Sequence, residues 1–387
     1  MKTCKTEQVE RLGEVRLVER ITKQFSANAN ANEQVVTAGA GEDDCAVLDL
    51  DEAKAKANYN SKYLVVTTDT LQESTHFPAG ISPFQIGWSA VAVNLSDIAA
   101  MGARPFAFTL ALGVPAETET VFVDEVVQGV KKCASAYNTA VAGGDTTRSK
   151  EVVLTGTCLG FADRPVRRAG AEVGDLVCVT GSLGNAALGQ KIVEREVAEG
   201  EKGGKKERKK ERKKEREKEG EEVELKVPKK VEEAAKKALF QPVPRVKEGV
   251  VLADSGLVTS MIDISDGLAL SLAALAKSSK VGFEIYEEKV PVAAAGDLAK
   301  LDLRLRRELA FYYGGDYELL FTLRASGGAE AGRAEAGARG NAELLRRLQR
   351  EVKMSVVGRV VPAEEGLYFK REDGTKEEVK IKGYQHF

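Results

Sequence analysis

Short apolar runs with strand character alternate with longer amphipathic segments along most of the chain, and this alternation constrains the fold more than any other feature. In the first half we expect helices over 9–25, 83–101 and 120–137, and strands at CAVLDL, YLVVTT, FAFTLALGVP and VVLTGTCLGF. The second half repeats the pattern. It has strands at DLVCVTG, LVTSMIDIS, GFEIYEE, GGDYELLFTL and SVVGRVV, one helix from Asp266 to about Ser278, and another helix before GGDYELLFTL. Mixed strands and helices in both halves predict an α/β or α+β protein with two domains of related build.

A polar stretch at 163–174 separates the two halves, so the predicted domains are residues 1–163 and 164–387. A length of 387 residues also favours two domains over one. Two segments do not fit a compact fold: a charged insertion at 199–222, and a segment at 325–341 rich in Ala, Gly, Arg and Glu that we expect to form a mobile loop.

The charged insertion has two readings. It can be a basic arm that binds nucleic acid, or a solvated spacer, helical or disordered. We favour the spacer because Glu recurs every few residues and no aromatic side chain is present to stack on bases.

Composition excludes several classes of protein. The net charge is only -2, which gives no global attraction for nucleic acid or membranes. No apolar run approaches the ~18 residues of a membrane span, and the charged N-terminus does not resemble a secretory signal. The five cysteines are scattered without a C-x-x-C pair, which indicates a reducing compartment, so we expect a cytoplasmic protein.

Aspartate recurs at predicted strand ends and helix starts, beside glycine or hydroxyl residues, in GEDDC, TTDT, NLSD, GGDTT, DISDG and GGDY. Each Asp alone is more often a turn residue or helix cap than a ligand. DISDG places two carboxylates and a serine directly after an apolar strand, and GGDTT joins a flexible backbone to a carboxylate and two hydroxyls. Oxygen ligands on separate elements, completed by substrate phosphates, are what Mg²⁺ requires, so the pattern predicts Mg²⁺-assisted phosphoryl transfer.

Other phosphate-site and catalytic patterns are weak or missing. GSLGNAALG follows the strand DLVCVT and opens a helical pattern, which would suit phosphate at a helix start. The sequence contains no Walker A motif and no protein-kinase H-R-D motif. Its two histidines, His76 and His386, lie far apart in the sequence, which argues against a Ser-His-Asp triad or a His-rich metal site.

In this order, the motifs resemble the thiamine-monophosphate kinase family, which belongs to one superfamily with aminoimidazole-ribonucleotide synthetase and selenophosphate synthetase. The resembling stretches span nearly the whole chain apart from the insertion and the Ala/Gly segment: GEDDCAVL, VVTTDTLQESTHF, IGWSAVAVNLSDIAAMGARP, VAGGDTTRS, RRAGAEVGDLVCVTGSLGNAALG, PVPR, MIDISDGL, GGDYELLF and GYQHF. The resemblance implies direct in-line transfer of the γ-phosphate of ATP to thiamine monophosphate, without a covalent intermediate or a catalytic nucleophile. It also implies a homodimer in which strands of the N-terminal domains join in a shared β-barrel, with active sites in clefts between the domains of each chain.

The resemblance also implies site residues. Ligands for several Mg²⁺ ions would be Asp44, Thr67, Thr68, Asp69, Asp97, Asp145, Asp263 and Asp266. The residues against ATP would be Gly144, Asp145, Arg168 and Ser265. On the substrate side, His76 would contact thiamine monophosphate, and Tyr384 would help to close over its ring.

One position departs from the family pattern G-G-E-D-Y-E-L: the sequence reads GGDYEL, with Gly315 where Glu is expected. Either the substrate loses one polar contact, or Asp316 or Glu318 compensates. This departure bears on substrate recognition more than on phosphoryl transfer.

Two alternatives remain at this point. One is another ATP-using member of the superfamily, although Cys4 and Cys45 lack the context that selenophosphate synthesis needs. The other is a scaffold or RNA-binding protein that uses the insertion. Deleting residues 199–222 distinguishes the kinase from the RNA-binding protein, because a kinase would keep its activity and an RNA-binding protein would lose its partner.

Overall fold

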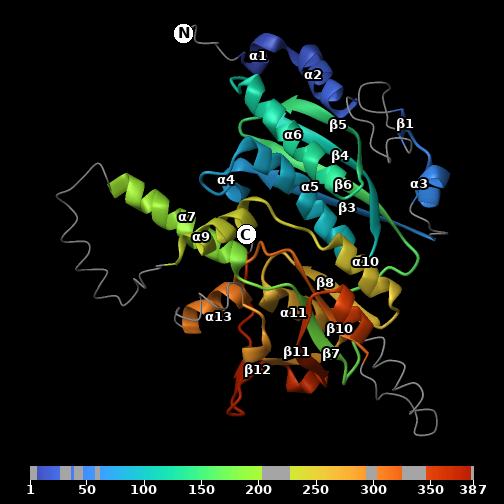
Figure 1. Cartoon of the computed structure of the whole chain (residues 1–387), viewed down its shortest axis with the longest axis vertical. Coiled ribbons are helices and arrows are strands. Elements are labelled where there is room, and N and C mark those ends of the chain that lie inside the picture. Colours follow the sequence, from blue (N-terminus) through green and yellow to red (C-terminus); the bar gives the residue numbers. More distant parts are fainter. Residues whose placement is uncertain are drawn as a thin grey trace.

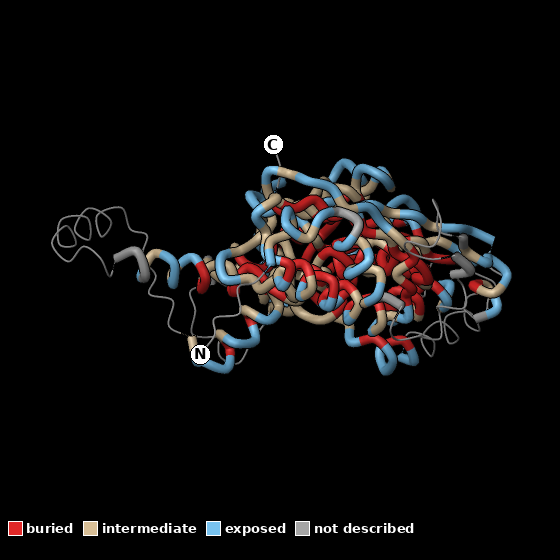
Figure 2. The backbone as a smooth tube through the Cα atoms, turned by 90° about the horizontal axis from the view of Figure 1, so that it is seen from above, coloured by how far each residue is buried: buried red, intermediate tan, exposed pale blue. Residues whose placement is uncertain are grey.

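The computed structural model describes residues 7–26, 36–38, 47–56, 62–202, 227–292, 303–324 and 346–384. Two β-sheets form the body of the molecule, one built from the first half of the chain and one from the second (Figure 1). Buried residues concentrate in the interior of this body (Figure 2). In the described part of the chain, no helix is long and apolar enough to cross a membrane.

The first sheet has four strands in the order β3-β6-β4-β5. They are β3 (Tyr63–Gln72), β4 (Arg104–Val114), β5 (Ala140–Arg148) and β6 (Val153–Ala162). β4 and β5 run parallel, whereas β6 is antiparallel to both β3 and β4. Among the described residues the sheet is open, with β3 at one edge and β5 at the other.

Two long helices pack together beside this sheet, α5 (Pro83–Ala100) and α6 (Thr120–Ala136). Ser82 and Gln85 form a capping box at the start of α5, and Pro83 occupies its first turn, so the local sequence fixes where this helix begins. Smaller elements complete the domain: α1 (Val9–Leu12), α2 (Glu14–Ser26), β1 (Val36–Ala38), β2 (Val47–Leu48), α3 (Leu50–Lys56) and α4 (Glu73–His76).

The second sheet has seven strands in the order β13-β12-β9-β11-β7-β10-β8. They are β7 (Leu176–Thr180), β8 (Val258–Ile264), β9 (Gly282–Tyr286), β10 (Glu318–Leu323), β11 (Met354–Val361), β12 (Leu367–Lys370) and β13 (Lys376–Glu378). The helices of this half are α7 (Asn185–Lys202), α9 (Lys229–Phe240), α10 (Val246–Asp254), α11 (Leu268–Ser279) and α13 (Leu303–Tyr312), with 3₁₀ turns at Glu287–Lys289 and Ala363–Glu365.

The two sheets share α5. Successive residues of β8 and β10 face opposite sides of their sheet, so Ile262 and Leu320 join a core with α11, whereas Met261 and Phe321 join the core that contains α5. α5 also packs against β3 and β6 of the first sheet and against α10. A helix that is covered on several sides needs apolar or small residues all round, which explains its largely buried sequence.

The structure agrees with most of the predicted strands and helices and differs in detail. The expected helix over 9–25 is divided into α1 and α2 at Gly13, whose φ of +79° ends the first segment. GGDTT lies inside the strand β5, and α9, α10, β12 and β13 lie outside the predicted elements. α7 extends into the predicted insertion as far as Lys202, while residues 203–226 and 325–345 lie outside the described residues.

Candidate active site

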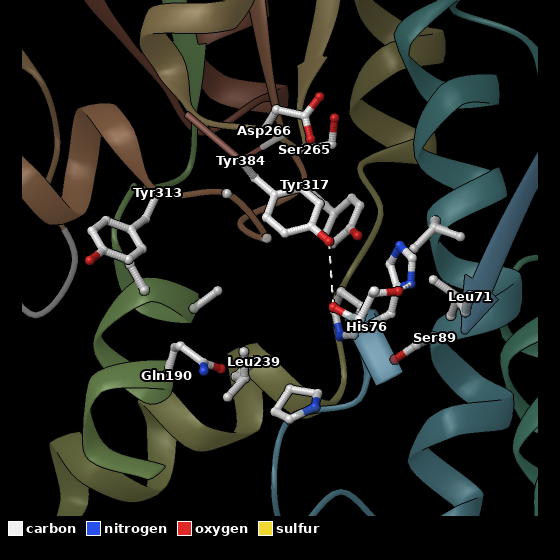
Figure 3. Close-up of a pocket in the computed structure, with 18 of the residues that line it drawn as sticks. Leu71, His76, Ser89, Gln190, Leu239, Ser265, Asp266, Tyr313, Tyr317 and Tyr384 are labelled. Carbon is white, nitrogen blue, oxygen red and sulfur yellow. Dashed lines mark hydrogen bonds between the residues drawn. The ribbon is translucent and has the colours of Figure 1, made fainter. Parts of the chain in front are cut away.

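A cavity of about 880 Å³ lies between the two halves of the molecule, and both halves contribute to its lining. Strand β3, the short α4 and helix α5 supply one side. The end of α9, α7, the end of β8 with the turn after it, α13 with the loop after it, and residues 382–384 supply most of the rest (Figure 3). The cavity is therefore assembled only when the two domains are in contact.

Four aspartates from both domains line this cavity: Asp69, Asp97, Asp263 and Asp266. Hydrogen bonds orient two of them. Thr67 donates to Asp97, and the hydroxyl of Ser96 on α5 donates to Asp263 over 2.7 Å, which connects the two domains directly at the cluster. The expectation that these aspartates sit at strand ends and helix starts was wrong for two of them, since Asp69 lies within β3 and Asp97 in the last turn of α5.

Burial and neighbouring carboxylates raise the pKa of two of these aspartates, Asp69 and Asp263. Burial raises the pKa of Asp69 to about 6, with further contributions from the charges of Asp97 and Asp266. Burial raises the pKa of Asp263 to about 7, and the neighbouring carboxylates add to it although the bond from Ser96 opposes the shift. Asp69 and Asp263 thus lie close to other carboxylates, and a bound cation would stabilise the negative charge gathered there.

The residues present fit Mg²⁺. Within the described parts of the chain, no three His, Cys, Asp or Glu side chains lie close enough together to hold an ion by themselves. Mg²⁺ in phosphoryl-transfer sites commonly uses one or two carboxylates together with water and substrate phosphates, so a loose set of hard oxygen donors is the appropriate chemistry. Asp44, another predicted ligand, lies outside the described residues.

The remaining predicted residues fall into two groups. His76, Ser265, Gly315 and Tyr384 line the cavity with the aspartates. Thr67, Thr68, Gly144, Asp145 and Arg168 lie outside its lining.

Residues of the second group occupy different positions. Thr68 bonds Thr157 on an exposed face of the sheet, because strand alternation turns it away from Thr67 and Asp69. Asp145 lies in an exposed part of β5. The exposed Arg168 lies near enough to Asp97 for its charge to lower the pKa of that carboxyl, although burial outweighs this effect.

Neither of the two acidic residues after Gly315 replaces the Glu expected there. Asp316 accepts hydrogen bonds from the backbone amides of Gly184 and Ala186, over 2.6 and 3.2 Å, at the start of α7. Glu318 is a buried residue at the start of β10 and accepts two bonds from Arg245, over 2.7 and 2.6 Å. Both carboxylates are thus engaged in contacts outside the cavity lining, which favours the other alternative, the loss of one polar contact to the substrate.

The contacts of Asp316 also bear on GSLGNAALG. The amides at the start of α7, which the sequence offered as a phosphate site, already donate to this carboxylate. An anion at the same position would have to displace this side chain from the amides, so the structure does not support a phosphate site at the start of α7.

Several tyrosines in the cavity were not predicted from the sequence, among them Tyr312, Tyr313 and Tyr317. Tyr317 has a φ of +51°, uncommon for a residue with a large side chain. Burial and the four carboxylates raise the pKa of its hydroxyl, which keeps it protonated and able to donate. The position of these tyrosines on either side of the GGD motif was the available signal.

Family models match the chain in two parts. The N-terminal domain of AIR synthase related proteins matches residues 42–162, and the C-terminal domain matches residues 172–370. Together with the two-domain α/β fold and its shared acidic cavity, these matches show that the chain belongs to the AIR synthase related proteins.

Curated relatives and solved structures narrow this class. The thiamine-monophosphate kinase of Methanospirillum hungatei is 37% identical over 281 residues, covering 72% of this chain and 78% of the relative. The thiamine-monophosphate kinase of Archaeoglobus fulgidus is 30% identical over 374 residues and covers 96% of each chain. The structure of AaThiL complexed with AMPPCP and TMP has a TM-score of 0.66 and 26% identity, and the match covers 99% of this chain and 100% of that one. Within the AIR synthase related proteins, the chain belongs to the thiamine-monophosphate kinases, which confirms the resemblance of its motifs.

Proposed function

We propose that the four-aspartate cavity is where this chain carries out the reaction of its family, transfer of the γ-phosphate of ATP to thiamine monophosphate to give thiamine diphosphate and ADP. The observation that carries the proposal is the meeting of Asp69, Asp97, Asp263 and Asp266 in one cavity between the domains. Family membership defines the reaction, and the cavity offers the chemistry that such a reaction requires.

The four cavity aspartates would hold Mg²⁺, with Asp44, Thr67, Thr68 and Asp145 as further ligands that follow from the family pattern. Mg²⁺ bound there would neutralise the phosphates of the two substrates and stabilise the charge of the transition state. Gly144, Asp145, Arg168 and Ser265 would contact ATP, and the guanidinium of Arg168 suits a phosphate.

The protein's own groups then act by positioning. An ionised phosphate oxygen of thiamine monophosphate attacks the γ-phosphorus, the bond from that phosphorus to ADP breaks in line, and no general base is required. His76 would contact the substrate phosphate. Tyr384 lies across the cavity from the turn of His76, with the two ring centroids 6.4 Å apart, and would cover the substrate ring (Figure 3).

Product analysis tests the function. Purified protein incubated with ATP, Mg²⁺ and thiamine monophosphate should form thiamine diphosphate and ADP in equal amounts. Asp69→Asn and Asp266→Asn should each lower the turnover by about 100-fold or more without unfolding the protein, because each removes a charge from the cluster. Asp51→Asn is the matched control, since Asp51 is an exposed residue of α3 outside the cavity lining. Undiminished turnover in either cluster variant would contradict the metal-site assignment.

We also infer a homodimer built on the N-terminal domains. β3 is an edge strand, and its Leu64 and Val66 are 49% and 56% exposed, which is unusual for apolar residues in a sheet. Pairing with a second copy would cover this face, and joining the two open sheets would give the barrel implied by the family pattern. For localisation we infer the cytoplasm, in keeping with three buried cysteines (Cys133, Cys158 and Cys178) that carry free thiols.

A further inference from the structure

The turn that carries His76 spans residues 72–76, where β3 ends and α4 follows. The ring of His76 accepts a hydrogen bond at Nδ1 from the backbone amide of Gln72 over 3.1 Å, so the orientation of the ring depends on the backbone of this turn. The carbonyl of Thr75 accepts the bond from the hydroxyl of Tyr384 over 3.4 Å, which Figure 3 marks across the cavity. Two groups on the substrate side of the cavity therefore depend on one short segment.

This turn cannot hold its own shape. α4 has only four residues, and the side chain of its N-cap residue, Gln72, makes no capping hydrogen bond. A single helical turn has no cooperative stability in water, because its nucleation costs more than its few hydrogen bonds return. Contacts from outside the segment must fix it.

Those contacts come from the connection between β5 and β6. The carboxylate of Glu151 accepts the backbone amide of Ser74 over 2.8 Å and the side-chain amide of Gln72 over 2.5 Å. A reciprocal pair lies beside it, in which the Val152 amide donates to the carboxylate of Glu73 over 3.0 Å and the Glu73 amide donates to the Val152 carbonyl over 2.9 Å. The turn is thus tied to the connection at three of its five residues.

Glu151 is the centre of this arrangement, because both of its oxygens accept bonds and each bond reaches a different residue of the turn. These bonds, led by the one from Ser74, lower the pKa of the Glu151 carboxyl, so the group is ionised at neutral pH and the bonds are charge-assisted. Its backbone is also held, since the hydroxyl of Ser149 donates to the Glu151 carbonyl.

We propose that Glu151 is a positioning residue for the acceptor substrate: its carboxylate fixes Gln72 and Ser74, and thereby holds His76 at the cavity. This inference rests on the proposed function, in which His76 contacts the phosphate of thiamine monophosphate. Glu151 itself is absent from the lining of the cavity, so it acts through the turn. The same connection follows β5, which carries Asp145. It therefore links the turn on the substrate side to the strand that is proposed to contact ATP.

Glu151→Ala removes both acceptors, and the expected result is a rise of about 10-fold in the KM for thiamine monophosphate, with kcat and the KM for ATP within about 3-fold of the wild type. The KM of Glu151→Gln for thiamine monophosphate should lie between those of the wild type and Glu151→Ala, because the carbonyl oxygen of the glutamine can still accept from Ser74. Glu125→Ala is the matched control, since Glu125 is an exposed glutamate of α6 in the same domain, and it should leave all three constants unchanged.

Two further measurements distinguish the positioning role of Glu151 from a purely structural role. Melting temperatures should stay within about 3 °C of the wild type, because Glu151 supports one surface turn and no core residue. In a His76→Ala background, Glu151→Ala should add little to the KM, since the two changes act on one contact and their effects are then not additive.

Three results would overturn the inference: an unchanged KM for thiamine monophosphate in Glu151→Ala, an equal rise in both KM values, or full additivity with His76→Ala. Titration calorimetry with thiamine monophosphate alone separates this inference from the proposed function. If the wild type binds the substrate and Glu151→Ala binds it equally well, only the positioning role fails. If the wild type neither binds nor phosphorylates it, the proposed function fails as well.

Discussion

Gly315 lines the cavity and has a φ of +90°, a backbone conformation that residues with side chains rarely adopt. A Cβ atom at this position would also lie 3.1 Å from the Cβ of Ala186 at the start of α7. Both the backbone and the packing therefore favour glycine here. A Glu at this position would require the loop between α13 and β10 to take another path.

Gly315→Ala should lower the free energy of unfolding by about 1–2 kcal/mol, because it combines left-handed backbone strain with a close contact. Gly374→Ala is the matched control: its φ is +84°, but a Cβ there meets no described atom within 4 Å, so it carries the backbone strain without the close contact. Urea unfolding of both variants measures the difference, and equal losses would show that the contact with Ala186 contributes nothing.

At the scale of elements, α7 begins on a carboxylate from another part of the chain. Asp316 accepts the amides of Gly184 and Ala186, and burial raises the pKa of its carboxyl to about 7 even though these bonds oppose the shift. The helix start that the glycine-rich sequence offered to a phosphate is thus closed by a side chain 130 residues away from Ala186. α7 in turn supplies Gln190 to the cavity wall, so this cap supports the site.

This cap predicts a pH-dependent stability. The folded-state pKa of Asp316, about 7, lies above the value of about 4 for an unfolded aspartate, so its contribution is full at low pH and is lost as the pH rises through 7. Asp316→Asn does not titrate. Between pH 6 and pH 8 the wild type should lose about 1.4 kcal/mol of stability relative to this variant. Urea unfolding at pH 6, 7 and 8 measures the difference, and a constant difference would place the pKa of Asp316 outside this range.

In the molecule as a whole, α5 lies between the two sheets and packs against elements of both domains. The cavity forms along this helix, with Asp97 near its end and Ser96 bonded to Asp263 of the second domain. This arrangement leaves the far face of the first sheet uncovered at β3, where the proposed dimer would form.

The dimer is tested by placing a charge on β3. Val66→Lys should raise the dimer dissociation constant by about 100-fold or more, because the lysine would be desolvated in the pairing surface. Val173→Lys is the control, since Val173 is 59% exposed but lies in the other half of the chain. Sedimentation velocity over a range of concentrations measures both variants. A wild type that stays monomeric, or equal effects of the two lysines, would rule out β3 as the dimer surface.

The sequence by itself determined most of the elements and much of the site. Apolar periodicity predicted the strands and long helices, and the order of the Asp-containing motifs predicted the family that the comparisons confirm. The sequence also determined which face each residue of this strand occupies: alternation along YLVVTTDT places Thr67 and Asp69 on one face and Thr68 on the other.

Only the tertiary structure decided which of these residues meet. Ser96 and Asp263 are 167 positions apart, and their bond depends on how α5 packs against both sheets, which local sequence preferences cannot fix. The same holds for Asp316, whose neighbours Gly315 and Tyr317 face the cavity while its own carboxylate turns to the start of α7. Sequence patterns determine which face or end of an element a residue occupies. The packing of distant elements against one another decides what that face or end meets.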